Sequence, residues 1–143
     1  MTEMPKQVRQ NAVALISLAL AIASLAYTTW RNESSEAHRN IRQAAFKTLE
    51  VVEELQVIVD ARRYQGDRMR GDYVAGWARV NLIGDLGSVM PAPMPAATMD
   101  LRKTWQENFN GWYADNDPES EKHISASIEA VRNGALQILQ MLR

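Results

Sequence analysis

Few residues in this 143-residue chain have the types and spacing that a reactive or metal-binding site requires. The two histidines, His38 and His123, are far apart, and neither lies in the Glu-x-x-His or His-Glu-x-x-His spacing of carboxylate-bridged metal bundles and zinc proteases. The chain has no cysteine, which excludes a disulfide scaffold, a zinc–thiolate site and a cysteine nucleophile. The sequence therefore indicates neither a metal site nor a reactive thiol.

The segment from Gly84 to Gly87 comes nearest to a phosphate-binding loop. It reads Gly-Asp-Leu-Gly and lacks both the remaining glycines and the Lys-Ser/Thr pair of that motif. Ser88 follows directly, without the second glycine that a nucleophile elbow requires. We therefore expect no enzymatic activity, no catalytic residue and no bound cofactor.

Charged side chains give weaker signals, each with a plain structural explanation. An acidic run at Glu50, Glu53, Glu54 and Asp60 suits a cation or a basic partner, but charges on an amphipathic helix usually face water. An arginine cluster suits lipid headgroups or a protein partner. The Met/Pro segment at 90–95 suits either a recognition strip or a rigid connector. Together these features suggest a candidate partner surface: Arg62, Arg63, Arg68, Arg70, Met90 and Met94.

Aromatic side chains are the last candidates for a ligand site. Trp77, Trp105, Trp112 and Tyr113 lie in segments of helical periodicity. Aromatic residues at this spacing form a core far more often than they line a ligand pocket. We therefore expect a core, and keep the pocket as the alternative.

An uncharged segment near the N-terminus is the first structural element that the sequence indicates. Residues 12–30, AVALISLALAIASLAYTTW, would form a helix of about 28 Å, close to the ~30 Å hydrocarbon thickness of a bilayer. Tyr27 and Trp30 suit the membrane–water interface at its end. A cleaved signal peptide, with Ser24-x-Ala26 as the cleavage site, is the rival explanation. Because the uncharged run continues past that site, we favour a single-pass signal anchor.

Small residues recur along one side of this predicted span at spacings of three and four. Such stripes let helix backbones approach closely in lipid, although an Ala/Ser-rich segment also produces them by chance. We interpret them as a candidate membrane-helix packing face, formed by Ala14, Ser17, Ala21, Ser24 and Thr28.

Basic residues do not decide the orientation of the span, because three cationic groups lie near each end. Lys6, Arg9 and the amino terminus stand against Arg31, Arg39 and Arg42. A short N-terminal tail commonly stays in the cytoplasm. We therefore favour a periplasmic body if the cell is bacterial.

Residues 31–143 show helical periodicity in four separate segments. An apolar stripe predicts a helix over 35–64, either capped at Ser34 or Ser35 or continuous with the membrane helix. Asp72, Thr98 and Asp117 are the expected N-caps of three further helices, and 90–95 is expected to be non-helical. The fold class predicted is all-α: a tail at 1–11, a transmembrane helix at 12–30, and a small bundle of about four helices within 31–143.

The charge balance bears on the partners. The chain carries 16 Lys and Arg against 17 Asp and Glu, a net charge of -1, which argues against a nucleic acid as the main partner. Residues 31–143 alone carry 14 basic and 16 acidic side chains. The expected partners are therefore the lipid bilayer and a protein, either a different chain or a second copy.

Several short motifs in the chain resemble those of small single-span proteobacterial membrane proteins. They are Arg31-Asn32-Glu33, the run from Glu36 to Ala44, Glu54-Leu55-Gln56, Gly76-Trp77, Asp85-Leu86 and Pro91-Ala92-Pro93. The resemblance implies a bacterial inner-membrane protein and adds no catalytic residue, since the group has no assigned activity. We expect a membrane-anchored accessory or scaffold protein that binds other proteins; the alternative is a membrane-tethered sensor or small-ligand-binding bundle.

Overall fold

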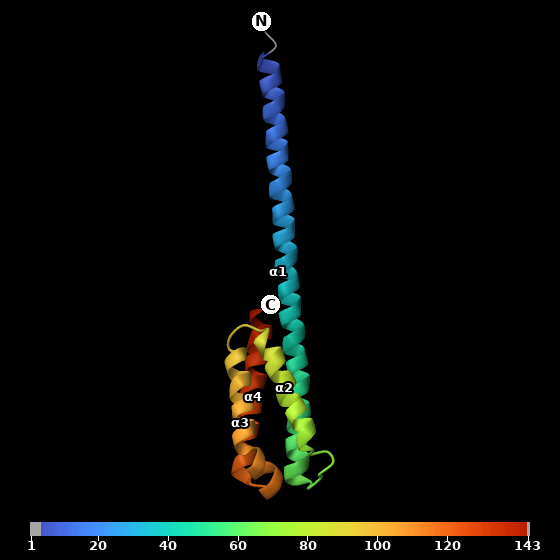
Figure 1. Cartoon of the computed structure of the whole chain (residues 1–143), viewed down its shortest axis with the longest axis vertical. Helices are drawn as coiled ribbons and strands as arrows, with labels where there is room; N and C mark the ends of the chain where they lie inside the picture. The colour runs from blue at the N-terminus through green and yellow to red at the C-terminus, as the bar shows by residue number, and fades with distance from the viewer. Residues whose placement is uncertain (1–3, 143) are drawn as a thin grey trace. The chain divides into compact units, whose positions relative to one another are not determined.

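The computed structural model describes residues 4–142, and the side chains of residues 11–142. It contains α1 (Met4–Tyr64), α2 (Tyr73–Ser88), α3 (Met94–Asn110), the π-helical segment η1 (Gly111–Asp115) and α4 (Pro118–Met141) (Figure 1). No strand occurs in the described part of the chain. The all-α prediction is confirmed.

The chain divides into two compact units, Met1–Arg39 and Asn40–Arg143, and α1 contributes residues to both. The helix passes through the polar stretch at 32–36 without a break, so the alternative of a separate capped helix is wrong. That stretch contains capping residues but neither glycine nor proline, and such residues inside a helix cost only tenths of a kcal/mol each, roughly. Because α1 begins at Met4, most of the predicted tail is helical, while residues 1–3 lie outside the described residues.

The second unit is a four-helix bundle closed around an apolar core. Residues 40–64 of α1 contact α2 through Glu54 and α4 through Glu53, and α3 lies on the other side of α2 and α4 (Figure 1). The stripe predicted from the sequence forms the α1 side of the core, since Ala45, Val52, Leu55 and Val59 are fully buried. The other helices complete it with Val80, Ile83, Leu101, Trp105, Trp112, Ile124, Ile128, Val131, Ala135 and Ile138.

Local capping chemistry sets two of the helix starts as predicted. The Asp72 carboxylate accepts a hydrogen bond of 3.1 Å from the Ala75 amide at the start of α2. The Asp117 carboxylate accepts from the amide and the hydroxyl of Ser120, at 2.9 and 2.7 Å, at the start of α4. These bonds satisfy amides that the first turn of a helix leaves without a backbone partner.

The start of α3 differs from the prediction. The helix begins at Met94 rather than after Thr98, with proline in its first turn. Proline is tolerated there because the first turn does not use its missing amide hydrogen. Thr98 is instead buried inside the helix, and a Cβ placed on Gly87 would collide with its side chain. Gly87 therefore permits the close contact of α2 with α3.

Candidate functional site

The N-terminal part of α1 has no protein covering among the described residues. From residue 11 to residue 39 every side chain is exposed, including large apolar ones such as Leu25 and Trp30. This helix is long and apolar enough to cross a membrane, and it lies near the N-terminus. The five small residues of the predicted packing face, Ala14 to Thr28, are all exposed, and the Thr28 hydroxyl donates to the Ser24 carbonyl at 2.8 Å.

Two of the four predicted surface arginines are used inside the bundle. Arg62 is buried and donates from Nε to the Tyr113 carbonyl at 3.0 Å, and its guanidinium lies 4.7 Å from the centre of the Tyr113 ring. Arg63 donates to the Asn116 carbonyl at 3.3 Å. The two side chains bond to carbonyls at the end of η1, which the helix itself leaves unsatisfied. They therefore connect the end of α1 to η1 and the residue after it, which lie between α3 and α4.

The other two arginines lie in the exposed loop that follows α1. The carboxylate of Asp67 accepts from the amides of Met69 and Arg70, at 2.9 and 3.0 Å, and so fixes the turn. The backbone hydrogen bond from Arg70 lowers the pKa of Asp67. Arg68 and Arg70 themselves point into solvent. Among the six residues of the candidate partner surface, these two are exposed.

The structure contradicts the surface placement of both methionines. Met90 is 4 % exposed and Met94 is fully buried, and both belong to the apolar core. The prediction that they contribute to a partner surface is therefore wrong. The reason is that the 90–95 segment joins two helices that pack on the same core. Met94 lies in the first turn of α3 against Gly134 of α4, where an added Cβ would lie 2.9 Å from the methionine sulfur.

The acidic run on α1 is largely bound within the second unit. Glu53 pairs with Arg132 of α4, whose hydrogen bond lowers the pKa of Glu53. Glu54 pairs with Arg79 of α2 at 3.2 Å. No cluster of three or more metal-ligating side chains occurs among the described residues. The run therefore joins helices rather than presenting a cation site.

The tryptophans fill the core instead of lining a cavity. Trp105 and Trp112 are fully buried, with ring centres 5.1 Å apart, and the Trp112 indole donates to the Val59 carbonyl at 3.2 Å. Trp77 is half-buried and meets Trp105 edge to face. The expectation that these side chains anchor the core is confirmed for Trp105 and Trp112.

An apolar outer face on α2 is a feature that the sequence reasoning missed. Val74, Ala78 and Leu82 are exposed and recur at a spacing of four, which places them on one side of the helix, and the exposed Val89 follows as the C-cap residue seven positions after Leu82. We call these four residues the α2 outer face. The sequence does contain a signal for it, because the 16 residues of α2 include only two charged side chains.

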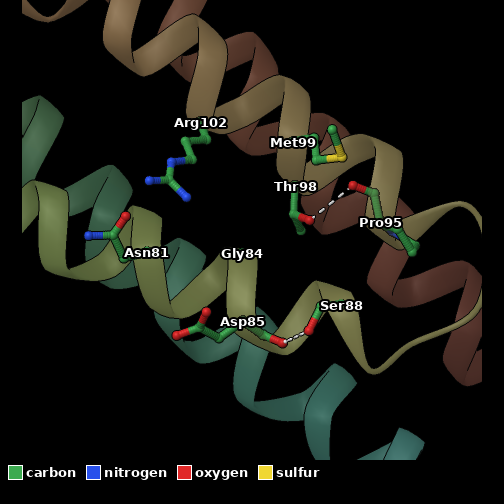
Figure 2. Close-up of a pocket in the computed structure, with 8 residues that line it drawn as sticks. All are labelled: Asn81, Gly84, Asp85, Ser88, Pro95, Thr98, Met99 and Arg102. Atoms are coloured by element: carbon green, nitrogen blue, oxygen red, sulfur yellow. Dashed lines mark hydrogen bonds between the residues drawn. The ribbon is translucent and has the colours of Figure 1, made fainter.

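A cavity of about 370 Å³ opens between α2 and α3 (Figure 2). Asn81, Gly84, Asp85 and Ser88 form its α2 wall, while its α3 wall is formed by Pro95, Thr98, Met99 and Arg102. The Thr98 and Ser88 hydroxyls donate to carbonyls of their own helices, at 3.2 and 2.7 Å. The side chains left to meet a ligand are Asn81, Asp85 and Arg102 (Figure 2).

No protein-family model, curated protein or solved structure matches the chain. The described residues define an all-α protein with one long apolar N-terminal helix and a four-helix bundle.

Proposed function

We propose that the chain is a single-pass membrane protein whose helical body binds another protein, as an accessory or scaffold subunit without enzymatic activity. The observation that carries the proposal is the wholly exposed, uncharged stretch of α1. Nine large apolar side chains between Val13 and Trp30 are more than half exposed. Their transfer from water into hydrocarbon is worth on the order of 10 kcal/mol, comparable to the whole stability of a small domain.

Features at the end of the stretch support a signal anchor. The rings of Tyr27 and Trp30 have centres 6.2 Å apart, and Arg31 follows at once. This order of apolar, aromatic and basic residues is typical of a helix leaving a bilayer. On the resemblance described above, we place the anchor in a bacterial inner membrane.

The α2 outer face supports a protein partner for the body. Four apolar side chains on one exposed helix face lose contact with water when a second protein covers them. Arg79, the one basic residue of α2, is already paired with Glu54, so a partner on this face would not need to supply it with a counter-charge. The partner is either a different protein or a second copy of this chain, which the small-residue face of α1 would also accommodate.

The alternative, a sensor with a tryptophan-lined pocket, draws no support from the core. Trp105 and Trp112 are fully enclosed by other side chains, so a ligand has no access to either ring. The interaction protein is therefore the function that the exposed surfaces favour.

Two experiments test the proposal. Alkaline carbonate should leave the full chain in the membrane fraction, and its release would refute the anchor.

Because the chain has no native cysteine, single cysteines at Ala78 and Leu82 report on the α2 outer face alone. In intact membranes a bifunctional thiol–amine reagent should join these variants to a second chain, while a cysteine at the exposed Lys103 of α3 should give far less product. Equal yields at all three positions would count against the α2 outer face.

A further inference from the structure

The cavity between α2 and α3 holds two opposite charges that do not contact each other. Asp85 stands on the α2 wall and Arg102 on the α3 wall (Figure 2). Neither forms an ion pair within 4.0 Å in the described part of the chain, whereas Arg79, the other charged residue of α2, binds Glu54 at 3.2 Å. A cavity that separates a carboxylate from a guanidinium matches a molecule that carries both an ammonium and a carboxylate group.

The remaining walls limit the size and polarity of such a molecule. The cavity volume of about 370 Å³ lies at the lower end of small-molecule sites. Pro95 and Met99 contribute apolar surface from α3, and Asn81 contributes an amide beside Asp85. Gly84 lies between Asn81 and Asp85 on the same wall, and a Cβ built on it meets no atom within 4 Å. The α2 wall therefore leaves space at Gly84, its floor, for a small apolar group.

We propose that this cavity binds a zwitterionic α-amino acid with a small apolar side chain. Asp85 accepts hydrogen bonds from the ammonium group, and Arg102 donates to the carboxylate. The side chain lies over Gly84 against Pro95 and Met99. Asp85 follows Leu82 by three residues and Ala78 by seven, so the site borders the α2 outer face. It does not depend on the membrane anchor, and its test uses free amino acids rather than a protein partner, so its failure leaves the proposed function standing.

The test uses the full chain in detergent micelles, labelled with nitrogen-15 and titrated with L-leucine, L-valine and L-methionine to about 10 mM. We expect saturable shifts of the Gly84, Ser88 and Thr98 amide signals with a dissociation constant near about 1 mM, as suits a small ligand at a partly exposed site. The amine 3-methylbutylamine and the acid 4-methylpentanoate each keep one charge of leucine and should bind at least about tenfold more weakly.

Variants locate the binding. Asp85→Asn and Arg102→Met should weaken leucine binding at least about tenfold, and Gly84→Leu should abolish it by filling the open floor while keeping a good helix former. Asp100→Asn and Lys103→Met change neighbouring α3 charges outside this cavity and should leave the affinity within about twofold.

Three results would overturn the proposal. The first is the absence of saturable shifts with all three amino acids. The second is equal affinity for leucine and for either single-charge analogue. The third is strong non-additivity between Asp85→Asn and Arg102→Met in the melting temperature of the ligand-free chain, because it would show that the two side chains bind each other.

Discussion

Replacing Gly76 of α2 with alanine is a direct test of how the core is packed. A Cβ at this position would lie 2.5 Å from Cη2 and Cζ2 of Trp105, far inside van der Waals contact. Trp105 is fully buried, so its ring cannot move away without repacking the core. We expect an overpacking cost of about 1–3 kcal/mol.

Gly84→Ala, two turns further along α2, is the matched control. Its added Cβ meets no atom within 4 Å, so this variant gains the helix propensity of alanine without the collision. That gain, about 1 kcal/mol, is common to both variants and cancels when they are compared. The difference in their stabilities therefore measures the contact with Trp105 alone.

Thermal unfolding of the full chain in detergent, followed by near-ultraviolet circular dichroism of the tryptophans, measures this difference. A cost of about 1 kcal/mol corresponds to roughly 4–8 °C in a domain of this size, so Gly76→Ala should melt at least about 4 °C below Gly84→Ala. Equal melting temperatures would refute the placement of Trp105 against Gly76.

Three further predictions concern Arg62, Asp117 and Leu20. Arg62→Met removes the bonds to the Tyr113 carbonyl and should destabilise the bundle by about 1–3 kcal/mol in chemical denaturation, whereas the exposed Arg68→Met should change its stability by less than about 0.5 kcal/mol. Hydrogen bonds from the side chain and amide of Ser120 lower the pKa of Asp117, so this carboxylate stabilises the fold above its unfolded pKa of about 3.9 and loses that effect as the pH falls through its lower folded value. Asp117→Ala should accordingly melt below the native chain at pH 7, with a gap that closes progressively below about pH 4; a gap that does not change with pH would contradict the assignment. Leu20→Arg places a charge in the middle of the apolar stretch at a cost of about 2.5–3.5 kcal/mol and should shift the chain out of the membrane fraction, which sedimentation after carbonate treatment would detect.

The helix starts at Asp72 and Asp117 were predictable because a cap depends on residues within one turn of it. The same reasoning failed at α3, where Met94 rather than Thr98 begins the helix. Prolines predict a non-helical segment at 90–95, but a proline in the first turn of a helix removes no backbone hydrogen bond. Capping residues therefore predicted the starts of two helices correctly. The start of α3 was misplaced because the prolines of 90–95 and the capping residue Thr98 indicated different boundaries.

The fate of the candidate surface depended on contacts between distant segments. Arg62 and Arg68 look equivalent in the sequence, yet the first meets a carbonyl 51 residues away and the second meets solvent. Met90, predicted at a surface, is instead buried in a core that all four helices build. The charges of Asp85 and Arg102 gave no signal, because no spacing in the sequence indicates that two helices will set them across one cavity.

The participation of α1 in the second unit also determines when that unit can fold during synthesis. Its residues 40–64 leave the ribosome first, but they are covered by helices made later, and Arg42 donates to the carbonyl of Leu142, 100 residues away. Synthesis proceeds at about 5–20 residues per second, so roughly 4–16 s pass between the synthesis of Tyr64, at the end of α1, and the completion of α4. Throughout that interval Val52, Leu55 and Val59 lack their native cover. The apolar stripe of α1 is therefore exposed during synthesis at least until α4 has emerged.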